Sequence, residues 1–347
     1  MSIQQRFVCR PQMRKNIKSR LGRLRRYRTA IAFSLTFSVI VGWRIIFPET
    51  LGEQGGINSE ITSGGAEIAP NVTMPLVSNG IGDHALWIRR GGRGIDTAYL
   101  YGDSEQRGVG KALRESGLDR VELFLTTKVT CCPTDRCNDV ACGKDLVYDP
   151  ESQISHSLEL LGVDYVDLLL LHFPCSSFTD TLRAWRVLET AHKEGRARSI
   201  GVSNFNSTLL DRLIESVEIV PAINQCAFSV AGHPASHQGR NKACQEGSTL
   251  YGSDMETVET CKRLGITYAA YSPLGHISRV HVLGNNVVKD IASLYNHTPA
   301  QTALRWVVQQ GIPVITSSRN AQHMDEILCI NDFSLSRDDM VLLKQVV

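Results

Sequence analysis

Residues 1–48 contain no aspartate or glutamate, although eleven lysines and arginines lie between Arg6 and Arg44. The first carboxylate is Glu49. Residues 49–347 therefore contain the remaining 26 of the 37 lysines and arginines, together with all 35 acids of the chain. An acidic body argues against nucleic acid as a partner, because domains that bind it present basic surfaces. The charge pattern therefore divides the 347 residues into a basic head and an acidic body.

The basic flank, residues 1–28, precedes a stretch of low charge, residues 29–47. These 19 residues carry one charge, Arg44, and approach the ~20 residues of a membrane-spanning helix. The positive-inside rule would keep the flank in the cytosol, so we expect a single-pass signal anchor with the body in the lumen of the endomembrane system. A plastid or mitochondrial transit peptide, also rich in arginine and poor in acids, stays open as an alternative.

None of the ten cysteines forms a C-x-x-C pair, which argues against a zinc site. Four cysteines lie in the stretch TCCPTDRCNDVACG, at Cys131, Cys132, Cys137 and Cys142. A loop cross-linked by disulfides fits this cluster better, and it would need an oxidising compartment. Glycosylation patterns at Asn71, Asn206 and Asn296 point the same way.

The chain also lacks the G-x-G-x-x-G turn that a doubly wound nucleotide-binding sheet would normally offer. Residues 48–70 have the glycine, serine and acid content of a linker. From residue 71 onward, apolar runs alternate with amphipathic stretches of helical period, which indicates parallel strands covered by helices on both faces. Eight runs predict a (β/α)8 TIM barrel over residues 71–347: MPLVSNGIG, RGIDTA, LFLTTKV, VDLLLLH, RSIGVSN, PAINQC, ITYAAYSPLG and IPVITSS.

Polar residues follow or end most of these runs, at the face of a barrel where active sites lie. Asp96 ends the strand predicted within the second run, and Tyr101 comes five residues later. Each residue alone has an ordinary structural explanation, such as a turn cap or a packed side chain. Their equivalent positions predict one funnel-shaped site, built from Asp96, Lys128, His172, Ser203, Asn204, Gln225 and Tyr271.

A lysine held by a carboxylate would stabilise a phenolate and lower the pKa of a nearby tyrosine from its usual ~10. Asp96, Lys128 and Tyr101 would supply this relay, and His172 would orient a substrate oxygen. Such a phenol donates a proton to a carbonyl as hydride arrives at the carbon. The hydride must come from a cofactor, because no side chain supplies one.

The stretches IDTAYLYGDSE, LFLTTKV, VDLLLLHFP, GVSNF, NQ and AYSPLG resemble, in order, the aldo-keto reductases. These barrel enzymes use NADPH without a Rossmann domain, and the resemblance runs from about Asn71 to the end. It implies reduction of an aldehyde or ketone by a monomer, through a catalytic tetrad of Asp96, Tyr101, Lys128 and His172. It also implies cofactor contacts from Ser203, Asn204, Gln225, Tyr271, Ser272, Leu274, Ser318 and Arg319, and substrate contacts from His172 and Phe173.

The chain departs from the family pattern in several places, and two of them bear directly on the first β/α unit and on cofactor binding. Only 22 residues separate Met74 from Asp96, so the first β/α unit is expected to be shortened. Ser317 stands where the family has the lysine that grips the 2′-phosphate of NADP, and His323 replaces the usual arginine. Arg319 is the candidate substitute, because a guanidinium pairs well with phosphate. NADPH is the expected cofactor, and NADH stays open.

Two functions remain open on this basis. The first is an active carbonyl reductase, and the second is a catalytically weak nucleotide-binding regulatory module, as in the potassium-channel β subunits that resemble this family. Short-chain dehydrogenases also use tyrosine and lysine, spaced Y-x-x-x-K. They are set aside because no tyrosine here has a lysine four residues later.

Overall fold

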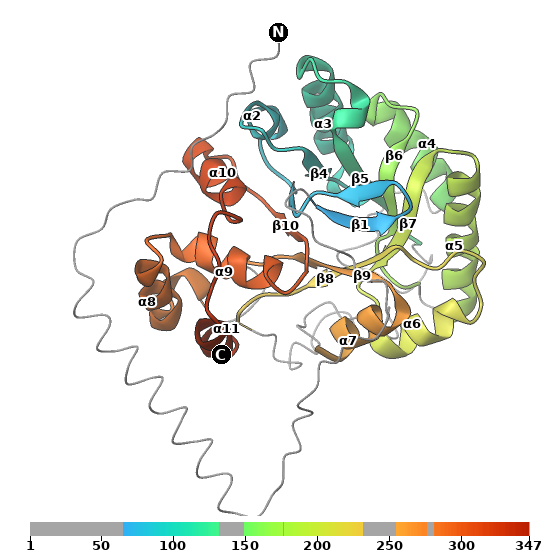
Figure 1. Cartoon of the computed structure of the whole chain (residues 1–347). Helices are drawn as coiled ribbons and strands as arrows, with labels where there is room; N and C mark the ends of the chain where they lie inside the picture. Colours follow the sequence, from blue (N-terminus) through green and yellow to red (C-terminus); the bar gives the residue numbers. More distant parts are fainter. Residues whose placement is uncertain (1–64, 132–148, 176, 232–254, 276–280, 347) are drawn as a thin grey trace, which may run out of the picture.

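Eight parallel strands close into a barrel in the computed structural model, which describes residues 65–131, 149–175, 177–231, 255–275 and 281–346 (Figure 1). Around the barrel the strands follow the order β10-β3-β4-β5-β6-β7-β8-β9, and each overlaps one of the eight apolar runs, so the predicted fold is confirmed. The strands are β3 (Val77–Asn79), β4 (Gly94–Asp96), β5 (Phe124–Val129), β6 (Val166–Leu171), β7 (Ala197–Ser203), β8 (Ile223–Ala227), β9 (Thr267–Tyr271) and β10 (Val314–Thr316).

Helices surround the barrel and begin and end at residues suited to helix termini (Figure 1). In α4, for example, the Asp149 carboxylate accepts a hydrogen bond from the Ser152 amide, Pro150 occupies the first turn, and Gly162 ends the helix at φ 68°. The α-helices are α2 (His84–Arg89), α3 (Asp103–Glu115), α4 (Pro150–Leu161), α5 (Phe178–Lys193), α6 (Ser207–Ile214), α7 (Met255–Leu264), α8 (Asn286–Leu294), α9 (Pro299–Val308), α10 (Ala321–Leu328) and α11 (Arg337–Leu343). Short 3-10 turns are η1 (Tyr99–Tyr101), η2 (Arg120–Glu122) and η3 (Val282–Gly284).

Strand β6 explains why the strands read as unbroken apolar runs. Leu169 and Leu171 pack outward into the layer between strands and helices, whereas Leu168 and Leu170 pack inside the barrel. Both faces of the strand are therefore buried, and neither tolerates a polar alternation. The polar side chains that these strands carry, such as Asp96 and Lys128, are consequently buried as well.

A two-stranded hairpin, β1 (Ala66–Ala69) and β2 (Val72–Met74), packs against side chains from inside the barrel, including Phe124 at the start of β5. Since Phe124 opens its strand, the hairpin covers the amino-terminal end of the barrel. Its first strand lies within residues 48–70, which were predicted to be a linker. Strand β1 therefore begins before the predicted boundary at residue 71.

The first β/α unit is short but closes the barrel. Helix α2 has six residues and is capped by Asp83, whose carboxylate accepts a hydrogen bond of 2.8 Å from the Leu86 amide. Trp87 is almost fully buried, and its indole nitrogen donates to the Gly94 carbonyl at 2.9 Å. Strand β3 pairs with both β10 and β4, so the shortened unit still joins the two ends of the sheet.

Within the described ranges, no helix has the length and apolar character needed to cross a membrane. The predicted basic flank (residues 1–28) and anchor (residues 29–47) lie outside those ranges and stay predictions. Cys132, Cys137 and Cys142 also lie outside them.

Candidate active site

A cavity of about 840 Å³ opens at the carboxyl ends of the barrel strands. The fold brings every residue of the predicted site to this cavity, except that Lys128 lies fully buried directly behind its wall. The predicted residues that line it are Asp96, Tyr101, His172, Phe173, Ser203, Asn204, Gln225, Tyr271, Ser272, Leu274, Ser318 and Arg319. The sequence had not singled out Gly80, Ile81, Pro273, Leu283, Ile315 and Thr316, which also contribute to the lining.

Lys128 uses its whole donor capacity inside the protein. Its ammonium donates to the Asp96 carboxylate, to the Thr97 carbonyl at 3.1 Å and to the Tyr101 hydroxyl oxygen at 3.4 Å. An ammonium has three N–H groups, and these three acceptors satisfy them. Burial lowers the pKa of Lys128, but the adjacent Asp96 charge and Tyr101 outweigh that effect and leave it raised, so the lysine stays charged.

Tyr101 lies in η1, just after β4, and presents its phenol to the cavity. Because Lys128 donates to the phenol oxygen, the hydroxyl proton of Tyr101 is free to point elsewhere. Burial raises the pKa of Tyr101 above its usual value and outweighs the lowering by Lys128. The prediction of a lowered phenol pKa was therefore wrong, and Tyr101 is protonated at neutral pH, the form that donates a proton.

His172 follows β6 and faces Tyr101 across the cavity. Its ring meets the Tyr101 ring edge-on at a centroid distance of 5.9 Å and stacks on Phe173 at 4.4 Å. Burial, with a further contribution from Lys128, holds the pKa of His172 well below its usual 6.5. The imidazole is therefore neutral at neutral pH and offers one donor and one acceptor nitrogen.

A hydrogen-bond network from β8, β9 and the end of β7 forms another part of the cavity wall. The Tyr271 hydroxyl donates to Asn204 Oδ1 at 2.8 Å, and Asn204 Nδ2 donates to the His172 carbonyl at 2.9 Å and to Ser203 Oγ at 3.0 Å. Gln225 Nε2 donates to Asp96 Oδ2 at 2.9 Å. Gln225 was predicted to end its strand, but it lies in the middle of β8. Its bond to Asp96 still connects this wall to the Asp96–Lys128 pair.

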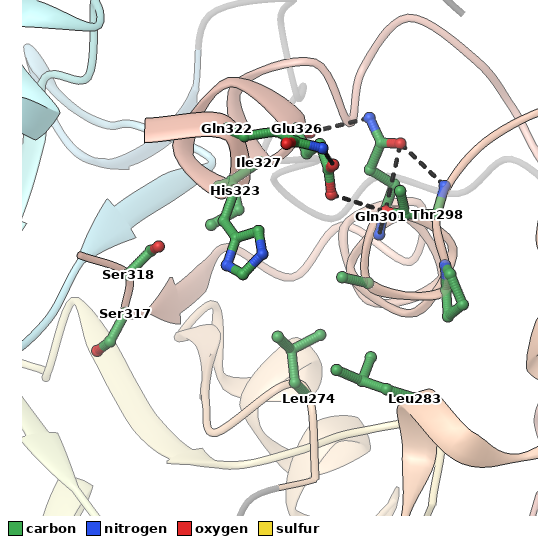
Figure 2. A pocket seen from close by; sticks show the side chains of 12 residues that line it. Leu274, Leu283, Thr298, Gln301, Ser317, Ser318, Gln322, His323, Glu326 and Ile327 are labelled. Atoms are coloured by element: carbon green, nitrogen blue, oxygen red, sulfur yellow. Dashed lines mark hydrogen bonds between the residues drawn. The ribbon is translucent and has the colours of Figure 1, made fainter. Parts of the chain in front are cut away.

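A second cavity of about 350 Å³ adjoins the first and shares Leu274, Leu283, Ser317 and Ser318 with it. Figure 2 shows His323 of α10 between the Ser317–Ser318 loop and the hydrogen-bonded group of Thr298, Gln301 and Glu326. Thr298 and Gln301 form the capping box of α9, and Glu326 accepts from the Thr298 hydroxyl at 3.1 Å. Sequence reasoning noticed Ser317 and His323 but missed the α9 residues, since a capping box reads as purely structural.

The sequence model of the family described as "Aldo/keto reductase family" matches residues 81–347 of the chain. The chain belongs to the aldo/keto reductase family. The 9,11-endoperoxide prostaglandin H2 reductase of Trypanosoma cruzi (strain CL Brener) is 37% identical over 73% of this chain and 77% of its own length. The glyoxal reductase of Bacillus subtilis (strain 168) is 36% identical over 73% of this chain and 78% of its own length.

Solved structures agree with this assignment. An aldo-keto reductase from Bombyx mori, in complex with NADP, superposes with a TM-score of 0.62 at 28% identity. The superposition covers 79% of this chain and 89% of that one. Aldo/keto reductases use NADP(H) to reduce carbonyl compounds, which gives this chain an oxidoreductase function in general terms.

The cavity walls of this aldo/keto reductase suit a nicotinamide dinucleotide. The Tyr271 ring supplies an aromatic surface, while Asn204 and Gln225 supply amides beside it. The joined cavities extend from Tyr101 to α10, which leaves room for an elongated ligand. Arg319 is exposed, lines the larger cavity and offers a guanidinium to a phosphate group.

Proposed function

We propose that the protein reduces an aldehyde or ketone to an alcohol with NADPH, as a carbonyl reductase in which Tyr101 is the general acid. NADPH, when bound, supplies the hydride. Ser203, Asn204 and Gln225 would hold the carboxamide of the nicotinamide, and Tyr271 would supply the aromatic surface beside its ring. Ser272, Leu274, Ser318 and Arg319 contact the rest of the cofactor, and Arg319 takes the role of the phosphate-binding lysine that Ser317 replaces.

The residues of the tetrad divide the work at the carbonyl oxygen. The neutral His172 donates a hydrogen bond that orients the oxygen toward Tyr101, and Phe173 forms an aromatic wall beside it. Tyr101 then gives its proton to this oxygen as negative charge develops there. Lys128 stabilises the phenolate that remains, and Asp96 keeps Lys128 charged and in place.

The observation that supports this assignment best is the fully buried Lys128, held between the Asp96 carboxylate and the Tyr101 oxygen. A buried charge pair costs desolvation energy and is weak evidence for stability by itself. Here Lys128 of the pair contacts the phenol of Tyr101, which lines a large cavity. A role in catalysis therefore explains why the charged pair is buried at this position.

Replacing Tyr101→Phe tests the proposal, with Tyr99→Phe as the matched control from the same 3-10 turn. Tyr99 is buried beside His156 and does not line the cavity. With glyoxal and an aromatic aldehyde as probes, we expect Tyr101→Phe to lose roughly 10²- to 10⁴-fold in kcat, the usual contribution of a general acid. Tyr99→Phe should keep its turnover.

Cofactor binding separates the alternatives. Quenching of intrinsic fluorescence by NADPH should be similar in the wild type and in Tyr101→Phe. Saturable NADPH binding without turnover in the wild type would favour the nucleotide-binding regulatory module. Full activity in Tyr101→Phe would refute the assigned acid.

We further propose that residues 29–47 anchor the chain and that the barrel, a monomer, lies in an oxidising lumen. A disulfide between Cys131 and Cys175 and the exposed Asn71 at the hairpin turn support this placement. Glycosylation of Asn71 tests it, because Thr73→Ala removes the acceptor pattern while leaving the turn residue intact. We expect glycosidase treatment to lower the mass of the wild type, and Thr73→Ala to have a lower mass than the wild type before treatment. Protease-accessible, unglycosylated protein in the cytosol or an organelle would overturn the lumenal placement.

A further inference from the structure

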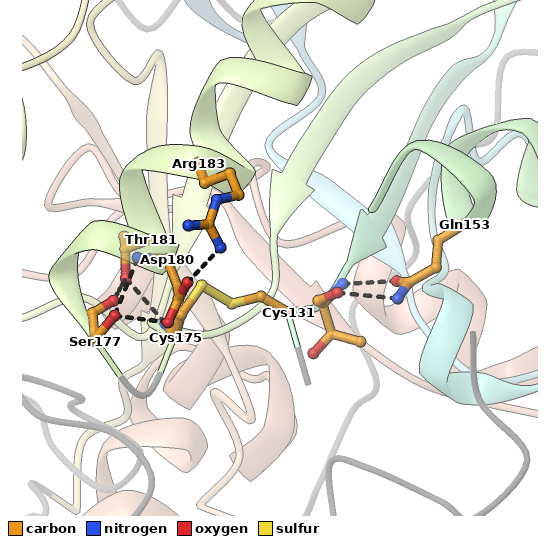
Figure 3. The surroundings of a disulfide bond; sticks show 8 residues. Cys131, Gln153, Cys175, Ser177, Asp180, Thr181 and Arg183 are labelled. Carbon is orange, nitrogen blue, oxygen red and sulfur yellow. Dashed lines mark hydrogen bonds and ion pairs between the residues drawn. A yellow bond between two sulfur atoms is a disulfide. The ribbon is translucent and has the colours of Figure 1, made fainter. Parts of the chain in front are cut away.

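Two cysteines follow the proposed catalytic residues at the same interval. Cys131 comes three residues after Lys128 and Cys175 three residues after His172, and a disulfide joins them (Figure 3). Their Cα atoms are 5.5 Å apart, at the carboxyl ends of the neighbouring strands β5 and β6. The cross-link therefore lies at the rim of the cavity, just after the proposed catalytic residues Lys128 and His172 in the chain.

The surrounding contacts fix the two ends of the disulfide unequally. On the β5 side, the Gln153 side chain bonds both the amide and the carbonyl of Thr130, at 2.8 and 2.9 Å. On the β6 side, the last ladder bond is from the His172 amide to the Val129 carbonyl, at 2.8 Å. The backbone at Thr130, after β5, is thus held firmly by Gln153. The disulfide connects the segment after His172 to this fixed backbone.

That segment carries the two rings that face the substrate. Nδ1 of His172 is buried and has no hydrogen-bond partner among the described residues, so hydrogen bonding at that atom does not set the ring orientation. Stacking on Phe173 and the edge contact with Tyr101 orient the ring instead. Phe173 is separated from Cys175 by Pro174 alone, whose ring restricts the backbone between them.

The far end of the segment has one further support. The Cys175 amide donates to the Thr181 hydroxyl at 3.1 Å, which ties it to the first turn of α5 (Figure 3). This bond fixes the backbone of Cys175 relative to α5, whereas the disulfide fixes it relative to β5 and therefore to Lys128. The ladder bond already holds the His172 amide on β5, so the cross-link acts on the residues after His172 and fixes the Phe173 ring on which the His172 ring stacks.

We propose that the Cys131–Cys175 disulfide is a positioning element for His172 and Phe173, and that its reduction weakens productive substrate binding without weakening cofactor binding. This proposal rests on the proposed carbonyl reductase function. A dithiol reduces the bond: its thiolate attacks Sγ of the partly exposed Cys131, Sγ of Cys175 leaves as thiolate and takes a proton, and the dithiol's second thiolate then releases Cys131 as the dithiol closes to a cyclic disulfide. Of the cofactor walls on β7 to β10, Asn204 contacts this segment at the His172 carbonyl, which precedes the residues that the disulfide ties.

The test compares the oxidised protein, the dithiol-reduced protein and the Cys131→Ser/Cys175→Ser variant. Cys329 is also disulfide-bonded, so the double variant treated with dithiol controls for effects of that other bond. We expect KM for the aldehyde to rise roughly tenfold on reduction, below the ~10²-fold that a 1 Å displacement can cost. The dissociation constant of NADPH should stay the same, and reoxidation should restore KM.

A purely stabilising disulfide would lower the melting temperature and leave KM unchanged below it. Equal KM and kcat in the oxidised and reduced forms would therefore overturn the proposal, as would a parallel loss of NADPH affinity. The ring-proton resonances of His172, assigned with His172→Gln, provide a readout that needs no turnover, and they should shift on reduction. Absence of turnover in every form would refute the reductase function, whereas unmoved His172 resonances would refute the positioning role.

Discussion

Replacing Asp96→Asn removes one negative charge from the centre of the site and leaves its shape almost unchanged. The new amide oxygen can still accept from Gln225 Nε2, which donates to Asp96 Oδ2 at 2.9 Å in the native protein. The fully buried Lys128 loses its counter-charge, however, and keeps only the Thr97 carbonyl and the Tyr101 oxygen as acceptors. Removing one partner of a buried ion pair typically costs about 3–5 kcal/mol, so we expect the free energy of unfolding to fall by that amount.

The pH dependence of this loss has a defined sign. In the native protein the pKa of Lys128 is raised above 10.5, so its contribution to stability is present below that pH and is lost as the pH rises further. Without Asp96, burial dominates and lowers the pKa of Lys128 in the folded state. The deficit of the variant should therefore be largest near neutral pH and should shrink as the pH approaches 10.5.

Urea titrations of four proteins measure the effect: the wild type, Asp96→Asn, Lys128→Met and the double variant. The double variant contains no isolated buried charge, so it should be more stable than Asp96→Asn alone. The reasoning is refuted if Asp96→Asn loses less than about 1 kcal/mol, the range of an ordinary substitution, or if the two single losses simply add.

Three further predictions concern other parts of the molecule. Arg319→Gln should weaken NADPH binding roughly tenfold or more and leave NADH binding unchanged in fluorescence titrations, because a hydrogen bond to a charged group contributes about 1.5–3 kcal/mol. Gly110→Ala should destabilise the protein by about 1–3 kcal/mol in urea, since its Cβ would lie 2.6 Å from the Leu161 carbonyl oxygen. Gly108→Ala in the same helix meets no atom within 4 Å and should instead stabilise it by about 0.5–1 kcal/mol. Because the pKa of His172 is depressed, the wild type should lose stability as the pH falls below 6.5, and His172→Gln should show a shallower loss.

The barrel was predictable because each strand is buried on both faces, which produces an apolar run that a local pattern reveals. The site was predictable because Asp96, Lys128 and His172 interrupt those runs near their ends. The hairpin was not, since β1 and β2 are short segments of alternating burial within a stretch rich in glycine and acids.

Two properties of the site depend on the folded structure and could not be read from spacing. Cys131 and Cys175 are 44 residues apart, and nothing in the cysteine pattern selects this pair over the others in the cluster. Burial raises the pKa of Tyr101 and the nearby charge of Lys128 lowers it, and the effect of burial is the larger of the two. A motif identifies which groups meet, but the balance between desolvation and attraction requires coordinates.

The hairpin also sets the orientation of anything joined to the amino end of the barrel. Gly65 leads into β1 at the end opposite the cavity, and the Asn71 carbonyl at the hairpin turn accepts a hydrogen bond of 2.7 Å from Arg198 at the start of β7. A fusion partner, an affinity tag or a solid support attached ahead of Gly65 would hold the enzyme by its closed base. The catalytic opening would then face away from the support, toward the bulk solution from which small molecules diffuse.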